Sequence, residues 1–269
     1  MSVFSSSIPT PAIVARLRAA GCVFAEDEAE LLVSTARTSA EITAMVERRV
    51  AGEPLEHVLG WAEFCGLRVA VEPGVFVPRP RTEFLIRQAV ALAREAAGVP
   101  VVLDMCCGTG AMGAALAGWL GRAELHAADL DPAAVRCARR NLPGAHVYAG
   151  DLYEPLPASL RGRVHIVIAS PPYVPSESVG LLPPEARLHE PLLALDGGGD
   201  GLDVVRRVIA GAPGWLAPGG HLLVETSERQ AAATVEAVAR AGLVARAEMS
   251  GELDATAVIG TLRREPRSP

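Results

Sequence analysis

The first fifty residues carry apolar side chains at helical spacing. Thr10 and Pro11 form a typical helix start, and Gly21 ends this first stretch. The apolar faces of three successive stretches are Ile13, Val14 and Leu17, then Ala29, Leu32, Val33 and Ala36, then Ile42, Met45, Val46 and Val50. This pattern predicts three short helices packed as a small N-terminal domain over residues 1–60.

Between residues 61 and 79 the apolar period changes from helical spacing to alternation. Apolar side chains at Leu67, Val69 and Val71 alternate with polar or small ones, as in a β-strand. The pair at positions 73 and 74, Pro-Gly, then supplies a turn. We therefore expect a β-hairpin connector over residues 61–79.

From residue 80 onward, apolar runs of strand length alternate with segments of helical period. Strands are expected at 99–103, 123–128, 145–149, 164–169, 220–225, 243–249 and 256–262, and helices begin near 110, 132, 201 and 229. This alternation predicts an α/β domain over residues 80–269, with a doubly wound, mostly parallel sheet and helices on both faces. No helix separates the last two strands, so an antiparallel edge is expected.

The composition fits a globular protein with an aliphatic core. Half of the 269 residues are hydrophobic, 4% are aromatic and 21% are charged, which excludes a disordered tail or a fibrous repeat. The 25 basic residues, all arginine, face 31 acidic ones, for a net charge of −6. Non-specific binding of nucleic acid depends on neutralising phosphates, so this balance argues against it and leaves only a local basic face open.

Cysteine usage and the start of the chain bear on location. The five cysteines are odd in number and include no CxxC pair, so neither a disulfide framework nor a zinc site is predicted, and the reducing cytoplasm fits best. No basic residue precedes a hydrophobic run at the start, as a secretory signal would require. Five glycines interrupt the uncharged stretch from Met105 to Gly121, which indicates a loop and helix rather than a membrane span.

A glycine-containing loop follows the first expected strand of the large domain. The strand leads into Asp104, Met105, Cys106, Cys107, Gly108, Thr109 and Gly110, and a helix starts directly afterwards. Glycines let a ligand approach the backbone, and the free N–H groups of a helix start favour a carboxylate or a phosphate. The loop also matches GxGxxG through Gly113, a pattern that alone does not separate a dinucleotide site from other nucleoside sites.

Acidic residues near the ends of the following strands point to a ribose. Asp129 comes 25 positions after Asp104, where a carboxylate can accept hydrogen bonds from both ribose hydroxyls. Asp131, followed by Pro132, is better explained as a helix cap. Asp151 has two interpretations of nearly equal weight, because it either receives the amino group of a base or is a turn residue.

Cysteine and histidine side chains near this loop are assigned structural roles. Cys106 and Cys107 have no resolving partner, so small packing residues in a tight loop are the better interpretation. His126, His146 and His165 lie within or beside strands and are expected to be satisfied structural residues. No cluster of His, Cys and Asp has metal-ligand spacing, and we predict no metal.

The strand at 164–169 ends in the sequence Ser170, Pro171, Pro172, Tyr173. Because proline donates no hydrogen bond, the carbonyls around it are free to accept from a ligand. The Ser170 hydroxyl and the Pro171 carbonyl are predicted to bind the two hydrogens of a planar NH2 group, with Tyr173 against its flat face. Such a nitrogen is a poor nucleophile, so the chemistry depends on positioning and on stabilising positive charge. The alternative is that the prolines merely end the strand.

Together these motifs resemble the protein-(glutamine-N5) methyltransferases, the HemK or PrmC family of class I S-adenosylmethionine (SAM) dependent enzymes. The resemblance spans nearly the whole chain. It further includes Gly52-Glu53-Pro54, Leu59-Gly60, Ala62-Glu63-Phe64, the run from Pro73 to Pro80, Thr82-Glu83, Gly150-Asp151, Glu190-Pro191 and the run from Ala194 to Gly198. The family implies a seven-stranded sheet and N-terminal helices that help to hold a protein substrate.

The resemblance implies a ligand for each part of the site. Asp104 and the loop Cys106–Gly110 would hold the methionine part of SAM, Asp129 its ribose, and Asp151 with Leu152 its adenine side. The segment from Ser170 to Tyr173 would hold the acceptor amide, with Ser170 also bordering the cofactor and Phe76 as a wall. The implied reaction methylates a glutamine side-chain nitrogen and leaves S-adenosylhomocysteine. The implied protein partner is a peptide chain release factor with its Gly-Gly-Gln motif, and no membrane is implied.

This chain departs from the family pattern at five positions. The family typically has Asn at Ser170, Gly at Cys106, Glu at Arg81, Asp at His165 and an aromatic residue at Leu152. The first departure concerns the acceptor, because an amide orients an amino group in ways that a hydroxyl cannot. The others indicate a divergent branch.

Other functions stay open on the sequence. Ser-Pro-Pro-Tyr is also similar to the motif of DNA amino-methyltransferases, which the acidic balance and the lack of a recognition domain disfavour; a small-molecule amine is the related alternative. The GxGxxG match motivates an NAD-dependent oxidoreductase, which leaves the segment from Ser170 to Tyr173 unexplained. Ser170 also motivates a catalytically silent family member that binds SAM or a partner without turnover.

Overall fold

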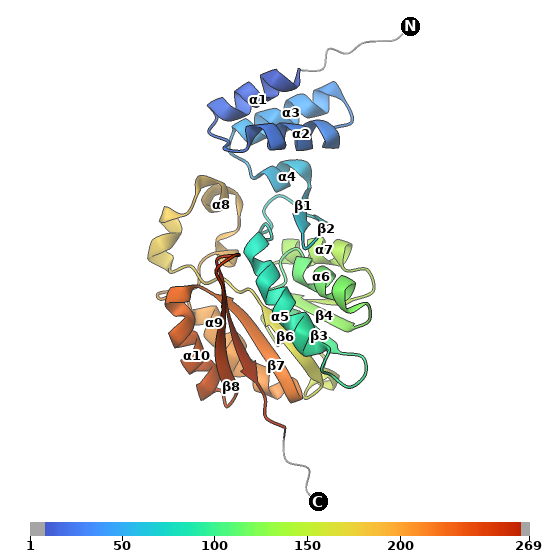
Figure 1. The fold of residues 1–269 in the computed structure, drawn as a ribbon, viewed down its shortest axis with the longest axis vertical. Coiled ribbons are helices and arrows are strands. Elements are labelled where there is room, and N and C mark those ends of the chain that lie inside the picture. Colours follow the sequence, from blue (N-terminus) through green and yellow to red (C-terminus); the bar gives the residue numbers. More distant parts are fainter. Residues whose placement is uncertain (1–8, 265–269) are drawn as a thin grey trace, which may run out of the picture.

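The computed structural model describes residues 9–264, so the start of the chain, on which the signal-peptide expectation rests, lies outside the described residues. The helices are α1 Thr10–Ala19, α2 Ala25–Thr35, α3 Ser39–Val50, α4 Leu55–Leu59, α5 Glu83–Ala93, α6 Ala111–Leu120, α7 Pro132–Asn141, α8 Pro184–His189, α9 Asp203–Gly211 and α10 Ala231–Arg240 (Figure 1). The strands are β1 Trp61–Phe64, β2 Leu67–Ala70, β3 Val101–Met105, β4 Glu124–Asp129, β5 His146–Ala149, β6 Val164–Ala169, β7 Leu216–Thr226, β8 Val244–Ser250 and β9 Ala255–Thr261.

The N-terminal helices form a bundle with its own apolar core. Ile13 of α1, Leu32 of α2 and Val46 of α3 are each fully buried in one cluster. The three helices predicted from the apolar period are confirmed. The short helix α4 was not predicted, because five residues are too few to show a helical period.

The connector after this bundle is an antiparallel hairpin of β1 and β2. The predicted turn at Pro73 and Gly74 exists, with the Val75 backbone nitrogen donating to the Glu72 carbonyl over 3.1 Å. It is not the turn of the hairpin, however. The chain reverses between β1 and β2 at Cys65 and Gly66, both in the left-handed region with φ of 51° and 75°.

The large domain is built on a seven-stranded sheet with the strand order β5-β4-β3-β6-β7-β9-β8. The first five strands of this order are parallel, and β9 pairs antiparallel with both β7 and β8. Helices α5 and α6 pack on one face of the sheet and α9 and α10 on the other (Figure 1). One buried apolar cluster lies between the sheet and each pair of helices. The predicted doubly wound α/β fold with an antiparallel edge is confirmed.

Two parts of the large domain were not predicted. Helix α5 lies between the connector and the first parallel strand, and the segment over residues 176–194 contains α8 between two 3-10 turns. Prolines at 183, 184 and 191 break any helical period in that segment. It lies beneath the N-terminal helices (Figure 1), and an ion pair of 2.6 Å joins Glu185 of α8 to Arg49 of α3.

Within residues 9–264, no helix combines the length and the apolar character needed to cross a bilayer.

Candidate active site

A cavity lies at the carboxyl ends of β3, β4 and β6, where ligands bind in open parallel sheets. We call it the cofactor cavity, after the residues predicted to bind the cofactor. Of the residues predicted to bind the cofactor, those that line it are Cys106, Gly108, Asp129, Asp151, Leu152 and Ser170. The other four, Asp104, Cys107, Thr109 and Gly110, are buried and do not line it. The sequence therefore placed most of these residues at one cavity, and their contacts with a ligand stay a prediction.

Asp129 is the acidic group best placed for a ribose. Its Oδ2 accepts a hydrogen bond from the Gly108 backbone nitrogen over 2.8 Å, and its Oδ1 accepts one from Asp131 over 2.9 Å. Each carboxylate oxygen has two lone pairs, so both can still accept from a hydroxyl. Burial raises the pKa of Asp129. Its two acceptor oxygens at a strand end suit the two hydroxyls of a ribose.

Asp104 is buried and does not line the cavity. Its Oδ2 accepts from the Gly113 backbone nitrogen over 2.8 Å and so ties the end of β3 to helix α6. Its Oδ1 has no hydrogen-bond partner among the described residues. Burial raises its pKa well above that of an ordinary aspartate. The visible role of Asp104 is to hold the loop and the start of α6.

The loop between Asp104 and α6 turns through left-handed backbone conformations. Gly110 precedes α6 at φ 76°, and a Cβ there would lie 2.9 Å from Leu142 Cδ1, so only glycine fits. Cys106 adopts φ 56°, which explains why glycine suits its position in the resembling family. Burial raises the pKa of Cys106 and Cys107, so these thiols are packing groups rather than nucleophiles, as predicted.

Asp151 is paired with a residue that the sequence did not single out. Its Oδ2 lies 2.6 Å from Nη2 of Arg207 on α9, and both side chains border the cofactor cavity. The two residues are 56 positions apart, so no local pattern could have indicated the pair. The predicted cap role of Asp131 is confirmed, because its Oδ1 accepts from the Ala133 backbone nitrogen over 2.8 Å.

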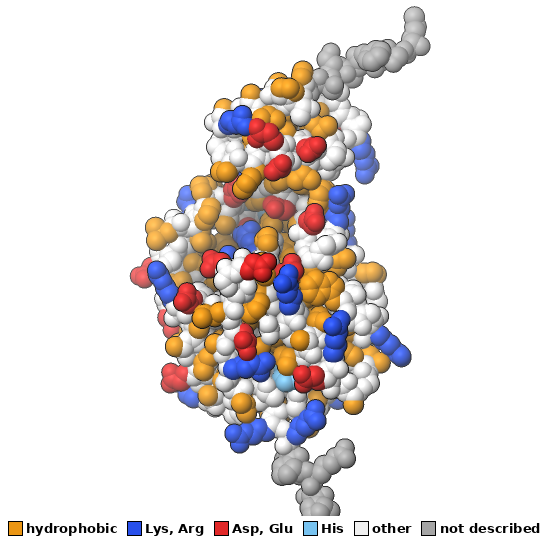
Figure 2. All heavy atoms as spheres, viewed as in Figure 1, with side chains coloured by type: hydrophobic (Ala, Val, Ile, Leu, Met, Phe, Trp, Pro, Cys, Tyr) orange, Lys and Arg blue, Asp and Glu red, His pale blue; other side chains and the backbone are white. Residues whose placement is uncertain are grey.

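A second cavity of about 350 Å³ lies beside the first, between the sheet, α8 and the chain near α4. Its wall includes Phe76, Ser170, Pro171 and Tyr173, all predicted for the acceptor side. The hollowed face between the N-terminal helices and the sheet domain is visible in the space-filling view (Figure 2). Ser170 and Phe76 line both cavities, so they stand between the cofactor side and the acceptor side. We call this second space the acceptor cavity.

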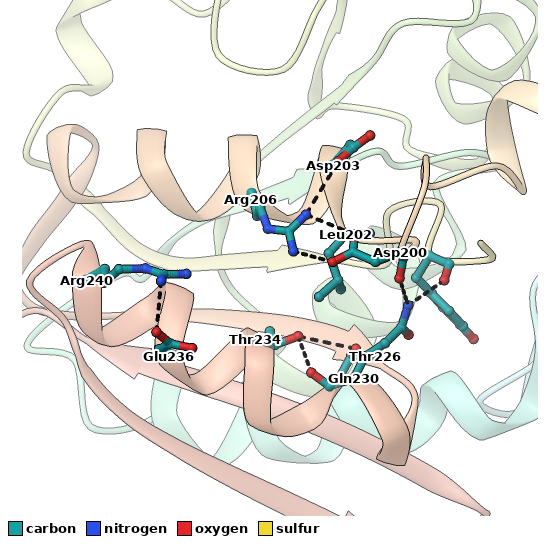
Figure 3. A network of polar contacts seen from close by, with 10 residues as sticks. Asp200, Leu202, Asp203, Arg206, Thr226, Gln230, Thr234, Glu236 and Arg240 are labelled. Atoms are coloured by element: carbon teal, nitrogen blue, oxygen red, sulfur yellow. Dashed lines mark hydrogen bonds and ion pairs between the residues drawn. The ribbon is translucent and has the colours of Figure 1, made fainter. Parts of the chain in front are cut away.

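Tyr173 is held at both ends by residues to which the sequence analysis assigned no role in the site. Arg81 Nη2 donates to its hydroxyl over 2.8 Å, and Gln230 Nε2 donates to its backbone carbonyl over 2.9 Å. The Gln230 amide also donates to the Asp200 carbonyl, as the close-up shows (Figure 3). Arg81 and the buried Glu225 line the acceptor cavity as well.

Of the three histidines predicted to be structural, His165 and His126 have hydrogen-bond partners, and the exposed His146 stacks on the His126 ring. His165 Nδ1 accepts from the Val101 backbone nitrogen over 3.0 Å. His126 contacts the Tyr148 hydroxyl and a carboxylate oxygen of Glu124, each over 3.1 Å. In the part of the chain that the structure describes, no group of three or more His, Cys, Asp or Glu side chains is arranged to hold a metal ion.

The chain is similar in sequence and in fold to known methyltransferases. The family model called Methyltransferase small domain matches residues 67–182. A release factor glutamine methyltransferase of Mycolicibacterium smegmatis is 38% identical over 260 residues, which cover 92% of this chain and 90% of the relative. The chain belongs to the release factor glutamine methyltransferase family. It is therefore a methyltransferase that uses SAM as its methyl donor. The alternative of an NAD-dependent oxidoreductase is wrong.

This methyltransferase is also similar to a second curated relative and to a solved structure. A 4-amino-L-phenylalanine/4-methylamino-L-phenylalanine methyltransferase of Streptomyces pristinaespiralis is 41% identical over 204 residues, covering 73% of this chain and 68% of the relative. A solved methyltransferase structure from Pyrococcus furiosus superposes with a TM-score of 0.55 at 17% identity, covering 74% of this methyltransferase and 90% of that chain. The structural likeness shows the shared fold.

Proposed function

We propose that this methyltransferase transfers the SAM methyl group to the side-chain amide nitrogen of a glutamine in a peptide chain release factor. The position of Ser170 on both cavities carries the proposal, because an acceptor bound there lies next to the donor side. The relative from Mycolicibacterium smegmatis, matched over nearly its whole length, supports the release factor as substrate. A location in the cytoplasm, where translation ends, belongs to the same proposal.

Different residues of the cofactor cavity bind different parts of SAM. SAM, when bound, supplies a methyl group on a positively charged sulfur. Asp129 binds the ribose hydroxyls, Asp151 and Leu152 border the adenine side, and Cys106 with Gly108 borders the methionine part. Asp104, which does not line this cavity, acts through the loop shape that its bond to Gly113 fixes. Cys107, Thr109 and Gly110 contribute to the same loop.

The acceptor segment positions a weak nucleophile. The Ser170 hydroxyl oxygen and the Pro171 carbonyl accept hydrogen bonds from the two amide hydrogens, Pro172 keeps the turn rigid, and Tyr173 packs against the amide plane. Transfer would form the nitrogen–carbon bond as the methyl–sulfur bond of SAM breaks, with S-adenosylhomocysteine as the leaving group, and the nitrogen would release one proton to solvent. The same oxygens stabilise the positive charge on the nitrogen during this step, so positioning replaces a strong base.

A small aromatic amine is the second candidate acceptor. Ser170 favours it. The asparagine that the family has at this position can donate a hydrogen bond to the carbonyl oxygen of a glutamine amide, and an aromatic amine has no such oxygen. The 41% identity to the Streptomyces pristinaespiralis relative supports it independently. A nucleic acid acceptor has no such support, since the chain carries a net charge of −6.

A competition assay tests the proposal. Labelled SAM is offered to the protein with a class I release factor and 4-amino-L-phenylalanine in the same mixture, and both products are counted. Label in the release factor supports the proposal, and label in the amine alone overturns it in favour of the second candidate. Label in neither, restored in the release factor by Ser170→Asn, would mark a catalytically silent member and also overturns the proposal.

A further inference from the structure

Three side chains on the wall of the acceptor cavity form a hydrogen-bonded group. Arg81 Nη2 lies 2.8 Å from the Tyr173 hydroxyl oxygen. Arg81 Nε and the Tyr173 hydroxyl each lie 3.4 Å from the same oxygen of Glu225, Oε1. All three residues line the cavity. We call them the Arg81 group.

The chemistry of arginine fixes the direction of these hydrogen bonds. A guanidinium has donors and no acceptor, so the Tyr173 oxygen must accept from Arg81 and its own proton points to Glu225. Burial raises the pKa of Tyr173, so the phenol keeps that proton at neutral pH. Thr82 Oγ1 donates to the other Glu225 oxygen over 2.7 Å and holds the carboxylate in place.

The Tyr173 ring packs against the buried apolar cluster under α9 and α10, and its hydroxyl carries its side-chain hydrogen bonds. Gln230 donates to the backbone carbonyl of Tyr173 and not to this hydroxyl. At the hydroxyl end of the ring, Arg81 makes the one short side-chain hydrogen bond among the described residues. The Arg81 side chain is 46% exposed. Without Arg81, the hydroxyl retains only the 3.4 Å contact to Glu225.

We propose that Arg81 is a positioning residue for methyl transfer, which acts by holding the Tyr173 ring against the acceptor nitrogen. The inference rests on the proposed role of Tyr173 and deepens it. It also assigns a task to a position where the resembling family has glutamate, a side chain that accepts hydrogen bonds and could not donate to the Tyr173 oxygen when ionised.

A double-mutant cycle tests whether Arg81 acts through the Tyr173 hydroxyl. Arg81→Ala and Tyr173→Phe each remove the same hydrogen bond, so each lowers kcat roughly tenfold, and the double variant falls no further. KM for the acceptor and the affinity for SAM stay unchanged. Arg81→Lys, which keeps one donor, recovers part of kcat. If Arg81→Ala does not fold, Arg81→Met, which keeps the apolar stem and has no donor, takes its place in the cycle.

Arg87, on the helix α5 that follows Arg81 in the chain, provides a matched control. Arg87 pairs with Glu83 on the surface of α5 over 2.7 Å, and Arg87→Ala retains the wild-type kcat. Losses that multiply in the double variant would overturn the inference, because Arg81 would then act independently of the hydroxyl. A raised KM with an unchanged kcat would also overturn it, since Arg81 would then contact the acceptor itself.

A measurement without any acceptor separates this inference from the proposed function. The chain has three tyrosines, so ring-labelled tyrosine gives few NMR signals, and Tyr173→Phe identifies that of Tyr173. Arg81→Ala shifts the Tyr173 signal and leaves those of Tyr148 and Tyr153 in place. An unshifted Tyr173 signal would overturn the inference whatever the acceptor. Failure of the wild-type protein to methylate a release factor would instead overturn the proposed function.

Discussion

The backbone nitrogen of Gly108 donates a hydrogen bond of 2.8 Å to Oδ2 of Asp129. This bond joins the loop after β3 to the end of β4, so the two residues are fixed relative to each other. Both border the cofactor cavity, where we propose that Asp129 binds the ribose.

The first prediction concerns Asp129. Asp129→Ala removes two charge-assisted hydrogen bonds to the ribose, each worth about 1.5 to 3 kcal/mol, so the affinity for SAM falls by at least roughly a hundredfold. Titration calorimetry with SAM measures this directly.

Asp27, exposed on α2, provides the matched control for this substitution. Asp27 does not line the cofactor cavity, so Asp27→Ala leaves the affinity for SAM in place. An unchanged affinity in Asp129→Ala would contradict the assignment of Asp129 to the ribose.

The second prediction concerns Tyr173. Its ring borders the acceptor cavity and not the cofactor cavity, so Tyr173→Ala lowers kcat while the affinity for SAM stays near that of the wild type. Turnover with labelled SAM and calorimetry on the same preparation provide both values. A large loss of affinity for SAM would contradict the assignment of Tyr173 to the acceptor cavity.

The third prediction compares two neighbouring cysteines. Cys106 has φ 56°, a region that costs a non-glycine residue roughly 1 to 2 kcal/mol, whereas Cys107 is not in the left-handed region. Cys106→Gly relieves that strain, so it lowers the free energy of unfolding less than Cys107→Gly does, by about 1 to 2 kcal/mol. Urea denaturation of both variants checks the difference. Equal losses would show that the Cys106 conformation stores no strain.

The fourth prediction is a pH dependence from Asp104. Burial raises its pKa well above the ordinary value, so the folded chain binds this proton more tightly than the unfolded chain. The resulting stability is complete below the ordinary aspartate pKa and is lost as the pH rises through the raised pKa. The stability of Asp104→Asn relative to the wild type therefore increases with pH.

Urea denaturation at a series of pH values measures this difference. A stability difference between Asp104→Asn and the wild type that does not change with pH would refute the raised pKa.

The sequence predicted the parts of the site that follow directly from strand ends. Asp129 and Ser170 each come at or just after the end of a parallel strand, and such ends meet at one edge of the sheet. The apolar periods likewise predicted the seven strands, because buried strands and amphipathic helices leave different repeats.

The parts that escaped prediction depend on contacts between distant residues. Arg81 and Glu225 are 144 positions apart and meet only after the sheet has formed. The pairing of Asp151 with Arg207 arises in the same way. Local patterns carry no information on such contacts. The segment over residues 176–194 escaped because its prolines conceal α8.

The most direct measurement is methyl transfer from labelled SAM to a purified class I release factor from the same organism, followed by peptide mass spectrometry to locate the methyl group. The account predicts a methyl group on the side-chain nitrogen of the glutamine in the Gly-Gly-Gln motif, and none when that glutamine is replaced by glutamate. A folded protein that binds SAM and leaves this glutamine unmodified would contradict it.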